Sequence, residues 1–178
     1  PAIAKLLKKS GSPALLHSDA VQAFMKLPFT VKSLGVDMLS ISGHKIHAPK
    51  GIGALYIRNG LKLKPYIMGG SQEGGRRAGT EAMPQIAAFG AACDAARADL
   101  SGNIRHMSAL RQLAIEQLRR DIPELVVIEG GAPHILSISM PGWRSEVLMN
   151  FLEAREIYVS KSSACKKGGR SHVLEAMG

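Results

Sequence analysis

The chain has 178 residues, of which 46% are hydrophobic but only 4% aromatic, so it can bury a core built mainly from aliphatic side chains. Its net charge of +9 would suit a nucleic-acid-binding protein, but the basic residues are spread along the sequence and few aromatic rings could stack on bases, so direct nucleic-acid binding is not expected. No apolar run approaches the roughly 18 residues of a membrane span and no signal peptide is visible, so no membrane association is expected.

In the first half of the chain, a short basic amphipathic piece is followed by apolar runs that alternate with a helical pattern. We expect strands at 14–19, 36–42 and 52–57 and a helical segment at 20–27. Glycines and prolines mark the joints between these segments. Short apolar strands that alternate with helices predict an α/β architecture.

The stretch 68–83 contains five glycines and a pair of arginines, which predicts a functional loop rather than a regular element. We expect Thr80 to cap a helix over 81–100, because Pro84 would still lie in the first turn. A second helix is expected at about 103–121, where apolar residues recur on one face.

The second half of the chain reads as a smaller α+β unit. Its expected elements are strands at 125–130 and 134–140, a helix at 145–155, a strand at 157–160 and the start of a helix at 171. We therefore place a domain boundary near residue 98, with 1–98 as part of a large domain and 99–178 as a small one. The abrupt beginning and end suggest a piece of a longer protein.

A lysine follows the second predicted strand, in the stretch SGHKIHAPKGIGALYI. Lys45 therefore lies where α/β folds bind ligands, and a partly desolvated amine can form a Schiff base with an aldehyde. Ser42 and His44 offer donors for a phosphate, and an aldehyde that carries a phosphate is pyridoxal phosphate. Taken alone, however, a loop lysine is more often merely solvated. His44 and His47 lack further ligands, so no metal site is expected.

Upstream, the motif HSDAVQ places Asp19 at the end of a predicted strand and Gln22 three residues later. Pyridoxal phosphate needs an acid beside its ring nitrogen to act as an electron sink. Asp19 could pair with that nitrogen, and Gln22 could bond the ring hydroxyl. The same spacing ahead of an apolar segment is also a helix-capping arrangement, and this alternative stays open.

The two cysteines have opposite surroundings, and they form no disulfide framework, which favours a reducing compartment. Cys93 lies in an apolar helical segment and is expected to be a small buried thiol. Cys165 lies in VSKSSACKKGGRS, where basic neighbours including Lys161 would favour the nucleophilic thiolate. The alternative is a chance surface cysteine. With a Schiff-base lysine in the same chain, the segment suggests sulfur transfer from a substrate thiol.

Together the motifs HSDAVQ, SGHKIHAPKGIGALYI, GGSQEGGRRAGTE and SSACKKGG resemble those of cysteine desulfurases, which are class V aminotransferase-like, fold type I pyridoxal phosphate enzymes. They occur in the family's order and at about its spacings. The resemblance implies part of a large pyridoxal-phosphate-binding α/β domain with a mainly parallel sheet, and a smaller α+β carboxyl-terminal domain that carries the cysteine loop.

The resemblance also implies how the cofactor would be held. Lys45 would carry pyridoxal phosphate and move the α-proton of the substrate. Asp19 would pair with the pyridine nitrogen, and Gln22 would contact the ring oxygen. Ser42 and His44 would bind the phosphate.

The activity that the resemblance implies is removal of sulfur from L-cysteine. Cys165 would attack the substrate sulfur, leaving alanine and an enzyme persulfide for an acceptor protein, such as an iron–sulfur scaffold or a tRNA-thiolation enzyme. The family's counterpart of Thr80 reaches the phosphate of the partner subunit, which implies a homodimer. The cytoplasm is the expected location.

The chain departs from the family's pattern in several places. Ala48 stands where a glycine is usual, Ser162 replaces a glycine of many relatives, and the run KKGGR is more basic than expected. A second phosphate-binding loop, a ring-stacking histidine and an arginine for the substrate carboxylate fall outside these residues. We therefore expect the chain to be inactive by itself.

Two alternatives to a desulfurase remain. A selenocysteine lyase or another class V aminotransferase-like enzyme would share the Lys45 and Asp19 positions. A non-catalytic basic binding module would keep the motifs only as scaffold and would not bind pyridoxal phosphate.

Overall fold

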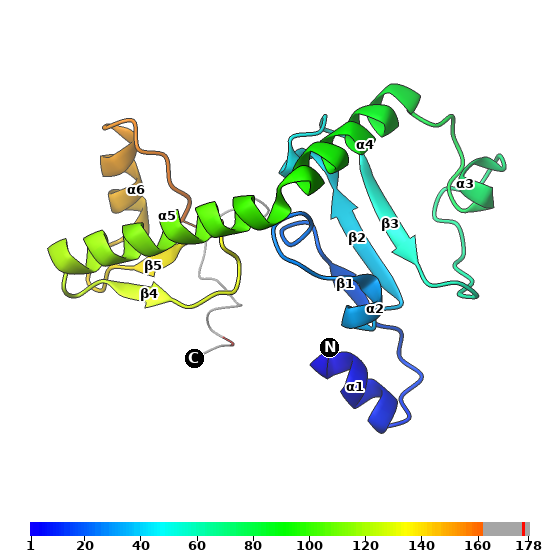
Figure 1. The fold of residues 1–178 in the computed structure, drawn as a ribbon, viewed down its shortest axis with the longest axis horizontal. Helices are drawn as coiled ribbons and strands as arrows, with labels where there is room; N and C mark the ends of the chain where they lie inside the picture. Colours follow the sequence, from blue (N-terminus) through cyan, green and yellow to red (C-terminus); the bar gives the residue numbers. More distant parts are fainter. Residues whose placement is uncertain (162–175, 177–178) are drawn as a thin grey trace. The chain divides into compact units, whose positions relative to one another are not determined.

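The computed structural model describes residues 1–161 and residue 176 and separates into two compact units (Figure 1). The first unit consists of Pro1–Glu116 and Glu129–Leu136, and the second consists of Gln117–Ile128 and the described residues from Ser137 onward. The division between these units falls inside a helix, after Glu116, rather than near residue 98. The boundary near residue 98 stays a prediction about the domains of the whole protein.

The first unit contains most of the helices and a three-stranded sheet. Its elements are α1 (Ala2–Lys9), β1 (His17–Asp19), α2 (Val31–Leu34), β2 (Met38–Ser42), the 3-10 helix η1 (Gly43–Ile46), β3 (Gly53–Ile57), α3 (Gln72–Gly75), α4 (Met83–Ala98) and most of α5 (Leu100–Asp121). The second unit contains the end of α5, then β4 (Val126–Ile128), the antiparallel β5 (Ser137–Ser139) and α6 (Ser145–Glu153). The predicted mixture of helix and sheet in an α/β fold is confirmed.

Strand β2 forms the centre of the three-stranded sheet. It pairs in parallel with β1, with Asp19 opposite Ser40, and antiparallel with β3, with Ser42 opposite Gly53. Because β1 and β2 are parallel neighbours, their carboxyl ends meet at the same edge of the sheet. Within the described residues, β3 has a hydrogen-bonded neighbour on one side only.

Two small apolar clusters hold the first unit together. One consists of Ala20, Val36 and Leu39. Ile46, Phe89 and neighbouring side chains form the other, where α4 packs against η1. The ring of Phe89 meets that of Phe24 edge-on, with 6.3 Å between the centroids. The second cluster therefore fixes the segment that carries Lys45 against a helix.

Large apolar side chains also lie on the surface of both units. Tyr66 and Met68 in the first unit are 99% and 83% exposed, and Trp143 in the second is 59% exposed. The second unit has an apolar cavity of about 310 Å³ lined by α6, β5 and the end of α5. Exposed apolar surface of this extent is typical of a face that another chain segment or protein covers.

The predicted helical segment at 20–27 is wrong. These residues form successive hydrogen-bonded turns, in which the amide of Phe24 donates to the carbonyl of Ala20. Met25 has a φ of 54°, outside the right-handed helical region. Pro28 then disfavours the helical conformation for the residue before it, so a regular helix has no room to form.

The predicted Thr80 cap is also wrong, because α4 begins at Met83 and its N-cap is Ala82, which makes no side-chain capping bond. A helix that began at residue 81 would need a backbone N–H at position 84 to reach the carbonyl of Thr80, and proline has none. Starting at Met83 keeps Pro84 within the first turn, as predicted.

Two expectations near the end of the chain have different outcomes. No strand forms at 157–160. Instead Glu156 takes a φ of 61° and the amide of Ile157 donates to the carbonyl of Leu152, which closes the end of α6. The helix expected from residue 171 lies outside the described residues.

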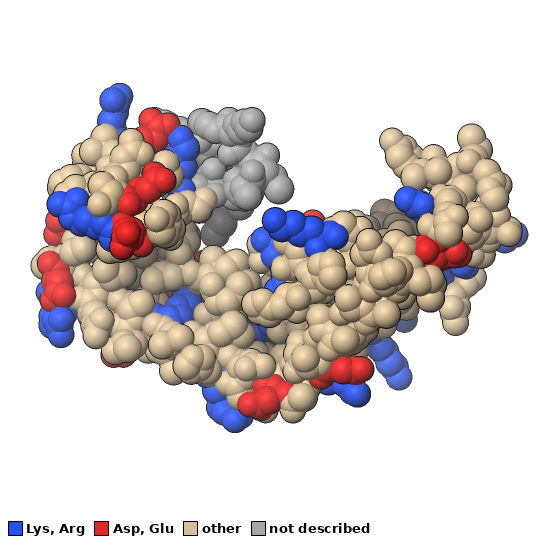
Figure 2. Space-filling view, turned by 90° about the horizontal axis from the view of Figure 1, so that it is seen from above, with Lys and Arg blue, Asp and Glu red and all other residues tan. Residues whose placement is uncertain are grey.

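On one face of the molecule, charged side chains are dispersed (Figure 2). On the face drawn in Figure 2, lysines and arginines lie singly or in small groups among acidic and uncharged residues. None of the helices in the described part of the chain is long and apolar enough to cross a membrane.

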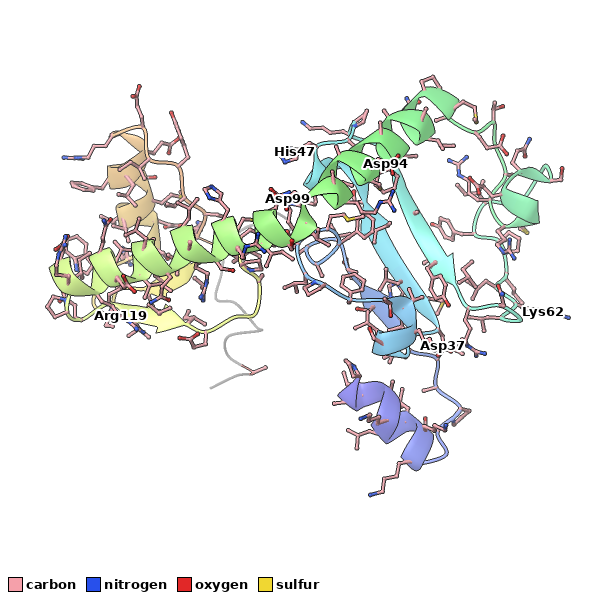
Figure 3. All side chains as sticks on the ribbon, viewed as in Figure 1. Asp37, His47, Lys62, Asp94, Asp99 and Arg119 are labelled. Carbon is pink, nitrogen blue, oxygen red and sulfur yellow. The ribbon has the colours of Figure 1, made fainter. Side chains whose placement is uncertain are left out.

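Asp37 joins all three strands at the end of the sheet opposite His47 (Figure 3). One carboxylate oxygen accepts from the backbone amide of Leu16, ahead of β1, at 2.8 Å. The other accepts from Nε of Arg58, just after β3, at 2.7 Å. These bonds, first that of Leu16 and then that of Arg58, lower the pKa of Asp37 below its ordinary value of 3.8.

We expect Asp37→Ala to lower the melting temperature of the full-length protein more than Asp37→Asn, because an asparagine oxygen can still accept from Leu16. Since folding lowers the pKa of Asp37, the carboxylate stabilises the fold above pH 3.8, and this contribution disappears as the pH falls through the lowered value. Melting curves of wild type and Asp37→Asn at neutral and acidic pH should therefore converge under acid. An unchanged gap would contradict the assignment.

Candidate functional site

The best-supported site lies at the carboxyl end of β2. The strand ends at Ser42 and runs directly into η1, which carries His44 and Lys45. The hydroxyl of Ser42 and Nδ1 of His44 are hydrogen-bonded at 2.7 Å. The side chain of Lys45 is half-buried and that of His44 is exposed. A hydroxyl, an imidazole and an amine thus stand within four residues at one edge of the sheet.

Gly43 allows this sharp turn from strand to 3-10 helix. Its amide donates to the carbonyl of Ile52 at 2.9 Å, and its carbonyl accepts from the amide of Ala48 at 3.1 Å. A Cβ at this position would lie 2.9 Å from side-chain carbons of Ala48 and Ile52 and 3.2 Å from the ring of Phe89. The methyl group of Ala48 is itself buried in this cluster.

Asp19 lies at the end of β1, at the same edge of the sheet. Its Oδ1 accepts from the backbone amide of Val21 at 2.9 Å, so part of the capping alternative is correct: the carboxylate caps the turns that follow β1. The second carboxylate oxygen can accept from a further donor. Gln22 lies on the first of these turns and is exposed.

His134 is a residue of this site that the sequence analysis missed. Its Nε2 lies 3.4 Å from Oε1 of Gln22, although the two residues are 112 positions apart. Burial, and then the charges of Lys26 and Lys45, hold the pKa of His134 below its ordinary value. A lone histidine at the start of an apolar strand carries no sequence signal that would have revealed this contact.

The structure leaves two predicted site residues apart from this group. Thr80 is exposed between α3 and α4, and no hydrogen bond within the described residues joins it to the Lys45 turn. Cys165 lies outside the described residues. Lys161, one of the basic residues expected to favour its thiolate, is paired with Glu146 of α6.

Cys93, expected to be a small buried thiol, is partly buried. It packs on the cluster of Ile46 and Phe89. Burial, and secondarily the charge of Asp94, raise the pKa of its thiol. Little thiolate is therefore present at neutral pH, which makes Cys93 a poor nucleophile.

We expect iodoacetamide at neutral pH to alkylate Cys165 faster than Cys93 in the full-length protein, because alkylation requires the thiolate. Peptide mass spectrometry over a time course would measure both rates, with the urea-unfolded protein as the reference in which the two rates converge. Faster labelling of Cys93 in the folded protein would contradict this assignment.

The chemistry of the donor set suits a phosphorylated aldehyde. The hydroxyl of Ser42 and the ring of His44 can donate to phosphate oxygens, the amine of Lys45 can condense with an aldehyde, and the carboxylate of Asp19 can hold a protonated ring nitrogen. By contrast, no group of three or more metal-ligating side chains is found among the described residues.

Comparison with known proteins gives a consistent result. The profile of the family "Aminotransferase class-V" matches residues 1–176. A cysteine desulfurase of a Nostoc species is 42% identical over 99% of this chain and 45% of its own length. One from Gluconacetobacter diazotrophicus is 42% identical over 92% of this chain and 42% of its own length.

Among solved structures, a protein described as NifS-like superimposes with a TM-score of 0.86 at 38% identity, covering 98% of this chain and 46% of its own. The chain therefore spans a little under half the length of the curated relatives and the solved structure that it matches.

Proposed function

Because this chain belongs to the class-V aminotransferase family, we propose that the whole protein is a pyridoxal-phosphate-dependent cysteine desulfurase, to which this chain contributes the cofactor lysine and the sulfur-accepting cysteine. The observation that carries the proposal is the turn after β2, where Lys45 follows Ser42 and His44 within a chain that is similar along nearly its whole length to cysteine desulfurases.

The residues of the site would have distinct tasks. When bound, pyridoxal phosphate supplies a ring that withdraws electrons and so weakens the bond between Cα and hydrogen of the substrate. Ser42 and His44 donate hydrogen bonds to the phosphate. Asp19 accepts a hydrogen bond from the protonated ring nitrogen and stabilises its positive charge, while Gln22 donates to the ring oxygen.

Lys45 and Cys165 would act on the substrate itself. The neutral amine of Lys45 takes up the proton from Cα of L-cysteine. The thiolate of Cys165 attacks the substrate sulfur, and a sulfur–sulfur bond forms as the carbon–sulfur bond breaks. The electron pair of that bond stays with Cβ, which takes up a proton and becomes the methyl group, and the protonated amine of Lys45 returns a proton to Cα to complete alanine. The sulfur remains on Cys165 as a persulfide.

The assembly of the whole protein is also part of the proposal. An exposed Thr80 between α3 and α4 is compatible with a contact to the phosphate of a partner subunit in a homodimer. A persulfide is a delivery form of sulfur, so the protein would hand it to an acceptor protein, such as an iron–sulfur scaffold or a tRNA-thiolation enzyme. The reducing environment that a free thiol needs favours the cytoplasm.

The test is mass spectrometry of the full-length protein, loaded with pyridoxal phosphate and treated with L-cysteine. We expect one additional sulfur atom on the peptide that bears Cys165, together with free alanine. Cys93→Ser should retain both products, and Cys165→Ser should lose the persulfide. Alanine released only from selenocysteine would indicate a selenocysteine lyase instead, and failure to bind pyridoxal phosphate would contradict the proposal.

A further inference from the structure

We propose that His134 is a positioning residue, which fixes the orientation of the Gln22 side-chain amide so that its NH2 group faces the cofactor ring oxygen. This inference rests on the proposed function, because Gln22 is assigned to the cofactor there. It adds a residue from the far end of the first unit's sequence, between β4 and β5, to a site otherwise built around the ends of β1 and β2.

The contact has a consequence for the direction of hydrogen bonding. An amide side chain has one oxygen, which accepts, and one NH2 group, which donates. The oxygen of Gln22 faces Nε2 of His134 at 3.4 Å, so the NH2 group is left for another partner. If the amide turned over, its oxygen would face the electron-rich ring oxygen of the cofactor, and two acceptors would repel each other.

His134 is suited to donate through Nε2. Nδ1 of its ring is buried and has no hydrogen-bond partner within the described residues. A proton on Nδ1 would therefore be an unpaired buried donor, which is costly, so the neutral ring carries its proton on Nε2. Burial, and then the positive charges of Lys26 and Lys45, also disfavour a charged imidazole and lower the pKa of His134.

The backbone on either side of His134 is held in place. Pro133 is buried, and the carbonyl of Ile135 accepts from Nε of Arg111 on α5 at 3.0 Å. Arg111 and His134 also line the same cavity, whose volume is about 330 Å³. An imidazole carried by backbone that is anchored on both sides can restrain an exposed amide better than one carried by a free loop.

The test uses the full-length protein reconstituted with pyridoxal phosphate and compares His134→Ala, Gln22→Ala and the double variant. The readout is the wavelength of the visible absorption band, which responds to hydrogen bonding at the ring oxygen. We expect each single variant to shift the band in the same direction, and the double variant to match Gln22→Ala alone. Loss of the restraint should also weaken kcat/KM for L-cysteine about two- to tenfold in His134→Ala.

Two further variants separate positioning from a structural effect. His134→Asn keeps an N–H donor and should restore the wild-type band at least in part. His106→Ala removes an exposed histidine of α5 and should leave the band unchanged. Additive shifts in the double variant, or an unshifted band in folded His134→Ala, would overturn the role of His134. A wild-type protein that shows no visible band would overturn the proposed function instead.

Discussion

Replacing Lys45 by alanine in the full-length protein is expected to abolish the visible absorption band of bound pyridoxal phosphate and to lower alanine formation from L-cysteine by at least about 100-fold. The amine is half-buried at the end of β2, beside the hydrogen-bonded pair of Ser42 and His44. No other amine lies within this turn, so no other group there could form the covalent link to the cofactor or take up the Cα proton. Absorption spectroscopy and an alanine assay measure the two losses separately.

The matched control is Lys62→Ala, which removes an exposed lysine from the loop after β3 (Figure 3). This variant should keep the absorption band and the activity. Circular dichroism should show that both variants are folded. A Lys45→Ala protein that stays yellow and active would refute the assignment, whereas loss of both properties in Lys62→Ala would point to a general effect of lowered charge.

Replacing Gly43 by alanine is expected to destabilise the full-length protein by about 1–3 kcal/mol, the range for overpacking a filled core. The new methyl group would lie 2.9 Å from carbons of Ala48 and Ile52, too close for an undisturbed contact. Relief requires the turn to move, and the turn carries Lys45. We therefore expect a lower melting temperature and a weaker affinity for pyridoxal phosphate in the same variant.

Gly90→Ala is the matched control for this substitution. Gly90 lies in α4, and a Cβ there would meet no heavy atom within 4 Å. Alanine favours a helix interior by up to about 1 kcal/mol over glycine, so this variant should be as stable as wild type or more so. Equal destabilisation by both substitutions would show that packing around Gly43 is not the cause.

Much of the sheet and the Lys45 turn could be predicted, because their signals are local. The apolar runs at 36–42 and 52–57 contain β2 and β3, and the glycines between them mark a turn that the structure confirms. The hydrophobic period and the turn residues are signals that extend over only a few positions, so a short stretch of sequence is enough to predict these strands and the turn between them.

The structural features that the sequence did not predict depend on residues outside the short stretch of sequence concerned. Residues 20–27 have a helical composition, but Pro28 and the φ of Met25 leave turns instead. The apolar run 157–160 needs a neighbouring strand, and none pairs with it among the described residues. The contact between Gln22 and His134 joins positions 112 apart, and only the fold brings them together.

The open side of β3 has a consequence for how this chain would behave in isolation. Its outer row of backbone N–H and C=O groups has no partner strand in the described residues, and Leu55 and Tyr56 on the same strand are exposed. Such an unpaired sheet edge can pair with a strand from another molecule and so start an intermolecular sheet. If the chain is expressed without a polypeptide that covers this edge, it is therefore expected to accumulate in inclusion bodies. Co-expression of a segment that pairs with the edge of β3 should increase the fraction of the chain in the soluble lysate.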